Sequence, residues 1–74
     1  MKNRLLDIFN KVFESSKVDE KVSKKNLSEW DSLKHINLIV EIESEFDISI
    51  EPDEIEEIVD FKSAEKIILQ KLNR

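Results

Sequence analysis

The residues of this chain with the clearest chemical potential are Asp31 and Ser32, which stand where a polar stretch meets an amphipathic one. The pattern predicts that a helix begins here, and the first backbone N–H groups of a helix lack partners and carry partial positive charge. Such a site favours a phosphate, and a serine hydroxyl there can be esterified to a phosphate while staying exposed. We expect Leu33, directly behind Ser32, to turn into the core and fix the start of the helix.

His35 raises a second possibility, because it lies three residues after Ser32 and the two side chains can meet on one helix face. A hydrolytic triad would also need a third group that orients the base, and an oxyanion hole. A chain of 74 residues without glycine offers neither readily. We therefore predict no catalytic activity, and we expect His35 to be an exposed residue beside Ser32.

Oxygen-bearing side chains alternate along residues 47–53, in a pattern similar to that of a calcium loop. They are Asp47, Ser49, Glu51 and Asp53. The pattern lacks the glycine that makes the sharp turn of such loops and the spaced terminal glutamate. We therefore predict no metal site.

Apolar residues at helical spacing predict the elements that must position these side chains. The first amphipathic segment runs from Lys2 to Ser15, with apolar residues spaced i, i+3, i+4 and i+7. Residues 16–30 are mostly polar and indicate a long connection, of a length that is uncommon in compact domains. Four apolar residues are expected to pin this connection to the core: Val18, Val22, Leu27 and Trp30.

The second helix is predicted to begin near Asp31 or Ser32, either of which is a good N-cap, and to run to about Phe46. Its length and its many apolar residues predict a wide apolar face. The residues of that face are Leu33, Ile36, Leu38, Ile39, Val40, Ile42 and Phe46.

The chain after residue 46 is predicted to hold a short extended stretch and two more helices. Pro52 suits the first turn of a helix, where its missing N–H costs nothing. A short helix follows to Ile58 or Val59, and Asp60 or Ser63 can cap a last helix that ends at Leu72. The residues expected to face inward are Ile48, Ile50, Ile55, Ile58, Val59, Ala64, Ile67, Ile68 and Leu72. The predicted fold is an all-α, four-helix bundle with three longer helices, one short third helix and a long first loop.

Charge is concentrated in one part of the chain. Ten acidic residues and no basic residue lie between Glu41 and Asp60, and the net charge of the whole chain is −5. This balance argues against nucleic acid and anionic membrane surfaces and favours partners with basic patches. No apolar run approaches the roughly 20 residues that span a bilayer, and there is no cysteine for a disulfide or a thiolate metal site. We expect one cytoplasmic, monomeric domain that occupies residues 1–74.

The tripeptide Asp31-Ser32-Leu33 is a weak motif alone, but its context is more specific. It opens the second helix of a small acidic bundle and is followed by an apolar run at 38–46, an acidic short helix and a final helix. In this context the chain resembles the acyl carrier protein family along nearly its whole length. The resemblance implies that Ser32 receives 4′-phosphopantetheine from coenzyme A through a phosphopantetheinyl transferase, with Asp31 and Leu33 beside it. It also implies that the terminal thiol of this arm holds acyl groups as thioesters.

The resemblance further implies a docking surface on the second helix and the acidic short helix. In the family these elements contact basic patches on the transferase and on acyl-transferring and chain-modifying enzymes. The matching positions here are Asp31, Val40, Glu41, Glu43, Glu54 and Glu57, and more loosely Glu56. Charges of this kind steer partners together and suit weak, reversible contact.

Some residues depart from the family's pattern in fatty-acid synthesis. Trp30 stands where those members often have a small residue, and Lys34 and His35 stand where they often have an acidic one. The chain is more similar to carriers of specialised pathways, such as polyketide or peptide assembly, surface-polysaccharide modification or D-alanine loading. A peptidyl or D-alanyl carrier, and an acidic helical adaptor without the arm, remain as alternatives.

The apolar interior is a candidate shelter for the acyl chain. The residues expected to line it are Val40, Ile42, Phe46, Ile55, Ile58 and Ile67.

Overall fold

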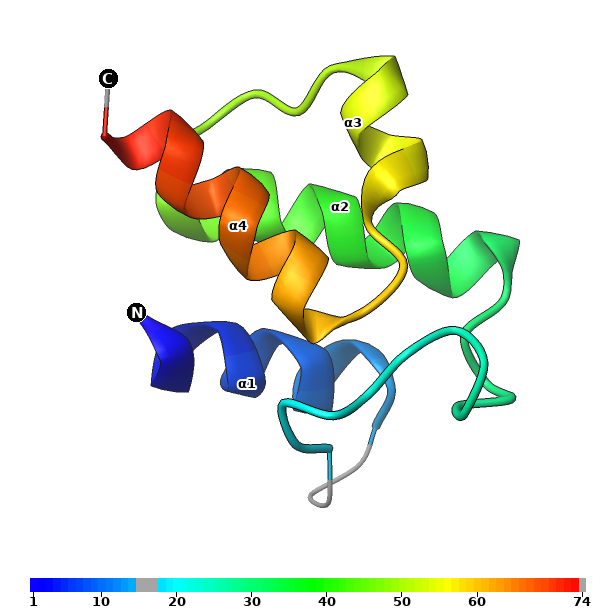
Figure 1. Ribbon diagram of the computed structural model, residues 1–74. Coiled ribbons are helices and arrows are strands. Elements are labelled where there is room, and N and C mark those ends of the chain that lie inside the picture. Colours follow the sequence, from blue (N-terminus) through cyan, green and yellow to red (C-terminus); the bar gives the residue numbers. More distant parts are fainter. Residues whose placement is uncertain (15–17, 74) are drawn as a thin grey trace.

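The computed structural model describes residues 1–14 and 18–73, and this part of the chain forms four helices (Figure 1). They are α1 (Lys2–Val12), α2 (Ser32–Phe46), α3 (Pro52–Glu57) and α4 (Phe61–Leu72). The prediction of an all-α, four-helix bundle with a short third helix and a long first connection is confirmed.

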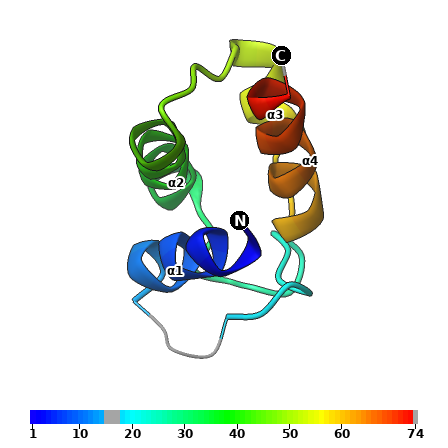
Figure 2. The ribbon, with the colours of Figure 1, turned by 90° about the vertical axis from the view of Figure 1, so that its left-hand side faces the viewer.

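The three longer helices enclose the core. Figure 2 shows α2 and α4 on opposite sides of the molecule, with α1 below them and α3 next to α4. Each long helix buries one face, as its apolar spacing predicts. The fully buried large side chains come from all three helices and from the segment after α3: Leu5, Phe9, Leu38, Ile42, Ile58, Phe61 and Ile68.

The first connection is fixed at several points. Helix α1 ends at Val12, earlier than predicted, because the chain turns through a left-handed backbone conformation at Glu14 (φ 52°); the predicted end at Ser15 lies outside the described residues. Val22 and Trp30 are buried and Val18 and Leu27 are half-buried, which confirms that apolar residues pin this connection to the core.

The connection is also paired with the start of α4. The backbone N–H of Lys24 donates to the carbonyl of Val59 (2.9 Å), and that of Phe61 donates to the carbonyl of Val22 (3.1 Å). These bonds form an isolated antiparallel bridge between Ser23 and Asp60. The prediction that Val59 faces inward is wrong: its side chain is exposed, because its backbone is engaged in this bridge while the core position is taken by the neighbouring Ile58.

Helix starts follow the predicted capping chemistry. The carboxylate of Asp60 accepts a hydrogen bond from the N–H of Ser63 (2.7 Å), so Asp60 is the N-cap of α4. Pro52 occupies the first position of α3, and Glu51 and Glu54 form a capping box around it. At the other end of α4, Leu72 is exposed rather than inward-facing, since it is the last residue of the helix and lies beyond its last buried residue, Ile68. Within the described residues, no helix combines the length and apolar character needed to cross a bilayer.

Candidate functional site

Ser32 is the first residue of α2, and its side chain is exposed. The preceding residue, Asp31, has extended backbone geometry and is the N-cap: its carboxylate accepts a hydrogen bond from the N–H of Lys34 (2.9 Å). Asp31 therefore satisfies one of the free N–H groups at the helix start, so the hydroxyl of Ser32 is not required for capping. No hydrogen bond of that hydroxyl is found within the part of the chain that the structure describes.

His35 is buried, which overturns the expectation that it is exposed beside Ser32. Its Nδ1 accepts a hydrogen bond from the indole N–H of Trp30 (2.9 Å), and its Nε2 lies 2.8 Å from the carbonyl oxygen of Ile55 in α3. An indole N–H can only donate and a carbonyl can only accept. With these partners Nδ1 acts as the acceptor and Nε2 as the donor, and both nitrogens are engaged. Residue 35 faces inward because it lies on the same face of α2 as Leu38, Ile39 and Ile42.

Trp30 anchors the residues before Ser32 to α1. Its ring lies 5.6 Å from that of Phe9 in an edge-on arrangement and 5.4 Å from that of Phe13, and it stacks on His35 at 6.0 Å. Such arrangements are favourable for aromatic pairs beyond the area that they bury. The prediction that Trp30 is a core anchor for the long connection is confirmed.

The opposite face of α2 is apolar but exposed. Leu33, Ile36 and Val40 are 70%, 52% and 55% exposed, and we call these three residues the outer face of α2. The predictions that Leu33 turns into the core and that Val40 lines the interior are therefore wrong. At about 100° per residue, these positions lie on the far side of the helix from the buried positions. Apolar residues occur nearly all round α2, and packing against α1 and α4 selects which of them are covered.

Carboxylates on the α1 side of α2 are engaged within the molecule. Glu41 pairs with Lys11 (3.1 Å), and Glu45 pairs with Arg4 (2.9 Å). Glu43, predicted to dock partners, accepts a hydrogen bond from the N–H of Ile50 (2.8 Å) and so holds the segment after α2. Two of the predicted docking residues on α2 therefore have internal partners.

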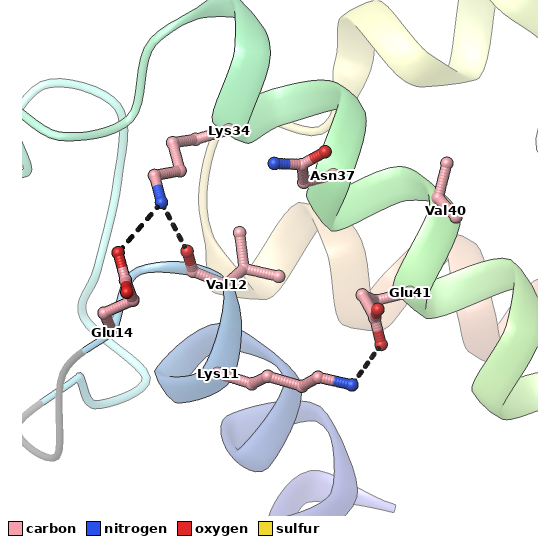
Figure 3. Close-up of a pocket in the computed structure, with 7 residues that line it drawn as sticks. All are labelled: Lys11, Val12, Glu14, Lys34, Asn37, Val40 and Glu41. Atoms are coloured by element: carbon pink, nitrogen blue, oxygen red, sulfur yellow. Dashed lines mark hydrogen bonds and ion pairs between the residues drawn. The ribbon is translucent and has the colours of Figure 1, made fainter.

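A shallow groove runs between α1 and α2 (Figure 3). At one end of it, the amine of Lys34 reaches the carbonyl oxygen of Val12 (3.1 Å) and the carboxylate of Glu14 (3.4 Å). The free carbonyls at the end of α1 thus receive a cation from α2. The groove is lined by Lys11, Val12, Glu14, Lys34, Asn37, Val40 and Glu41.

The acidic residues of α3 divide into two kinds. Glu54 forms an ion pair with Lys71 of α4 (2.8 Å), in which the lysine side chain is only 8% exposed. Glu56 and Glu57 are exposed at the end of α3 that His35 contacts, and Glu57 was predicted to dock partners. Among the described residues, no group of three or more His, Asp or Glu side chains is placed to hold a metal ion.

Comparison with solved structures finds proteins of the same fold. The solution NMR structure of a holo acyl carrier protein from Geobacter metallireducens has a TM-score of 0.87 to this chain, with 28% sequence identity. The match covers 97% of this chain and 85% of that one. No protein-family model and no curated protein sequence matches the chain. The backbone agrees over nearly the whole chain and Asp31-Ser32-Leu33 opens the second helix, so the chain has the fold of this acyl carrier protein, and the match supports the resemblance to that family.

Proposed function

We propose that this carrier protein holds acyl groups as thioesters on a 4′-phosphopantetheine arm attached to Ser32. The observation that carries the proposal is the position of Ser32, an exposed serine at the first position of α2 in a family whose solved member was determined in its holo form. The arm would supply the reactive thiol that this chain lacks, since it contains no cysteine.

The residues around Ser32 fit such a group. Because Asp31 rather than Ser32 caps α2, esterification of the Ser32 hydroxyl leaves the cap intact. The phosphate would lie beside the helix start, where backbone N–H groups and the helix dipole favour negative charge. Leu33 is exposed next to it and offers an apolar contact to the arm or to a bound enzyme.

The loading step requires an external enzyme and coenzyme A. The Ser32 oxygen attacks the phosphorus of coenzyme A that bears the pantetheine. A new oxygen–phosphorus bond forms, the pyrophosphate linkage breaks, and adenosine 3′,5′-bisphosphate leaves with the electron pair. The phosphopantetheinyl transferase must accept the hydroxyl proton, because both ring nitrogens of His35 are already engaged by Trp30 and Ile55. This engagement also supports the proposal that the chain has no catalytic activity of its own.

We propose that partners dock on the outer face of α2 and on the C-terminal end of α3, where Glu56 and Glu57 are exposed. The outer face of α2 presents apolar contacts next to Ser32, while Asp31, Glu56 and Glu57 supply exposed negative charge. Glu41, Glu43 and Glu54 contribute to the negative field, but direct contact with a partner would require each to leave its internal partner. The expected partners are the transferase and acyl-transferring or chain-modifying enzymes with basic patches. The net charge of −5 disfavours nucleic acid and anionic membranes.

Residues near Ser32 favour a specialised pathway over housekeeping fatty-acid synthesis. The buried contact of Trp30 with His35 accounts for two of the departures from the family's fatty-acid pattern, since each residue needs the other as a hydrogen-bond partner. Cargo in polyketide, peptide, D-alanyl or surface-glycan assembly fits the same attachment chemistry. We expect the protein to act as a monomer in the cytoplasm.

The test is intact-mass measurement after incubation with coenzyme A, Mg²⁺ and a promiscuous phosphopantetheinyl transferase. The wild type should gain one phosphopantetheine, Ser32→Ala should gain none, and Ser44→Ala should behave as the wild type, because Ser44 is another exposed serine on α2. Failure of the folded wild type to gain mass with several transferases would overturn the proposal in favour of an adaptor without the arm. A mass gain on Ser32→Ala would place the attachment site elsewhere.

A further inference from the structure

Two buried side chains bracket Ser32 in the sequence and contact each other in space. Trp30 precedes the Asp31-Ser32 pair, His35 follows it, and the indole N–H of Trp30 donates to Nδ1 of His35 (2.9 Å). We infer that His35 is a positioning residue for the loading of Ser32, acting through Trp30. This inference rests on the proposed function and goes beyond the capping role of Asp31.

Three hydrogen bonds close the turn that carries Ser32. Besides the Trp30–His35 bond, the carboxylate of Asp31 accepts from the N–H of Lys34 and the carbonyl of Asp31 accepts from the N–H of His35, each at 2.9 Å. Two of these bonds belong to the helix itself and would form in any capped helix. The Trp30–His35 bond is the one that depends on side chains particular to this chain.

The turn is also anchored on both sides. Trp30 packs against Phe9 and Phe13 of the α1 segment, whereas His35 donates from Nε2 to the carbonyl of Ile55 in α3. Ser32 itself is exposed, so nothing on its own side chain fixes its place. Its position relative to the rest of the molecule is therefore set by its two buried neighbours.

Position matters because the Ser32 oxygen must meet a phosphorus atom held by another protein. A displacement of about 1 Å of a reacting atom can cost about a hundredfold in rate. Without the bond to His35, the indole of Trp30 keeps its ring contacts but loses the directional contact that fixes its orientation. The adjoining Asp31-Ser32 backbone then samples more positions, and fewer of them are productive in the bound complex.

The two bonds of His35 can be separated by substitution. The amide oxygen of asparagine lies close to where Nδ1 lies in histidine, so His35→Asn can still accept from Trp30 but cannot reach Ile55. The amide nitrogen of glutamine lies close to where Nε2 lies, so His35→Gln can still donate to Ile55 but loses the Trp30 bond. Trp30→Phe removes the indole N–H and keeps an aromatic ring. A purely structural role would make all three variants alike after correction for unfolded protein.

The experiment compares the steady-state loading kinetics of these three variants with those of the wild type, using coenzyme A and one transferase. We expect kcat to fall about tenfold for Trp30→Phe and His35→Gln, to stay close to wild type for His35→Asn, and KM for the carrier to change little throughout. Ile68→Val, a buried change in α4, serves as the control for lost stability. Unchanged kcat in Trp30→Phe and His35→Gln, or an equal loss in all variants including Ile68→Val, would overturn the inference.

A spectroscopic readout checks the bond itself. The chain has one tryptophan and one histidine, so one indole N–H signal and one imidazole pattern report on the pair. Nitrogen NMR should show Nδ1 without a proton and Nε2 with one in the wild type, and the indole signal should move in His35→Gln but much less in His35→Asn. A proton on Nδ1 would contradict the inference even if loading proceeds. Absence of wild-type loading would instead overturn the proposed function, and the positioning role with it.

Discussion

The α1–α2 half of the molecule and the short helix α3 are held in place by different forces. Helix α1 buries four side chains against the core, and α2 buries five. Helix α3 spans only six residues and buries none of them fully, although Ile55 is half-buried. Burial of apolar surface is the main source of stability in a small domain, so α1 and α2, together with α4, form the core, and α3 contributes little to it.

Helix α3 depends instead on two polar contacts, made by the adjacent residues Glu54 and Ile55. Glu54 near its start pairs with Lys71 of α4, and the carbonyl of Ile55 accepts a hydrogen bond from His35 of α2. Each contact involves one element outside α3, so α3 is tied to both α2 and α4. Segments with few buried apolar contacts open locally at lower free energy than the core does. The comparison therefore predicts that α3 can detach while α1, α2 and α4 stay folded.

The largest expected loss of stability comes from a substitution in the core. Phe9→Ala removes a fully buried ring that contacts Phe13, Trp30 and Phe61. Such a truncation typically lowers the free energy of unfolding by about 3–5 kcal/mol, a large part of the stability of a small domain. Urea denaturation followed by circular dichroism should show a much lower midpoint or no folded baseline. A loss below about 1 kcal/mol would mean that the aromatic cluster is not what holds α1 to the core.

The next largest loss of stability should be confined to α3. Lys71→Met keeps the buried stem of Lys71 and removes the charge that Glu54 pairs with. Removing one partner of a mostly buried pair is costly, about 1–3 kcal/mol when one side is partly exposed. Hydrogen exchange should become faster at the amides of residues 54–58 than at those of α1 and α2. Uniform acceleration of exchange across all four helices would show that α3 is part of the cooperative core. It would contradict the prediction that α3 detaches separately. Lys66→Met, an exposed position on α4, is the matched control.

Local chemistry explains why so much of the fold could be predicted from the sequence. Asp31, Asp60 and Pro52 each act through bonds within a few residues, so their capping and helix-start roles need no knowledge of the tertiary structure. Apolar periodicity likewise placed the helices within a few residues. The candidate attachment residue, Ser32, was found by its motif and its position at a helix start, both of which are local features.

Features that depend on packing could not be predicted in the same way. Apolar residues surround most of α2, and only the packing of α1 and α4 decides that Leu38 is covered while Leu33 and Val40 are exposed. The prediction that His35 is exposed was wrong for the same reason, since a polar residue is expected on the surface unless a buried partner is known. Its partners, Trp30 and Ile55, are five and 20 residues away. A tryptophan five residues before a histidine on the core face of α2 was the available signal for this pair.

A smaller effect should follow from the cap that begins α4. Asp60→Ala removes the acceptor of the Ser63 N–H and half of the capping box, and should cost about 1 kcal/mol. Asp60→Asn should cost less, because asparagine is also a good N-cap. Urea midpoints of the two variants give the comparison directly. If both variants lost the same stability, the charge of Asp60, rather than its hydrogen bond, would be what matters.

The smallest expected change in stability concerns the ion pairs between α1 and α2, and it bears on docking. The side chains of Lys11 and Glu41 are 71% and 36% exposed, and exposed pairs contribute roughly 0–1 kcal/mol. Lys11→Met should therefore barely move the urea midpoint. It should, however, free Glu41 to meet a basic partner, and it changes the net charge by one, from −5 to −6.

Lys25→Met makes the same charge change at an exposed position in the first connection and leaves the Glu41 pair intact, which isolates the role of Glu41. If Glu41 docks partners, the transferase should show a lower KM for Lys11→Met than for Lys25→Met. The difference should shrink as salt is raised, because exposed charges are screened over about 10 Å at 0.1 M ionic strength. Equal KM values at low salt would show that Glu41 is not part of the docking surface. The proposed docking surface would then consist of the outer face of α2 and the C-terminal end of α3.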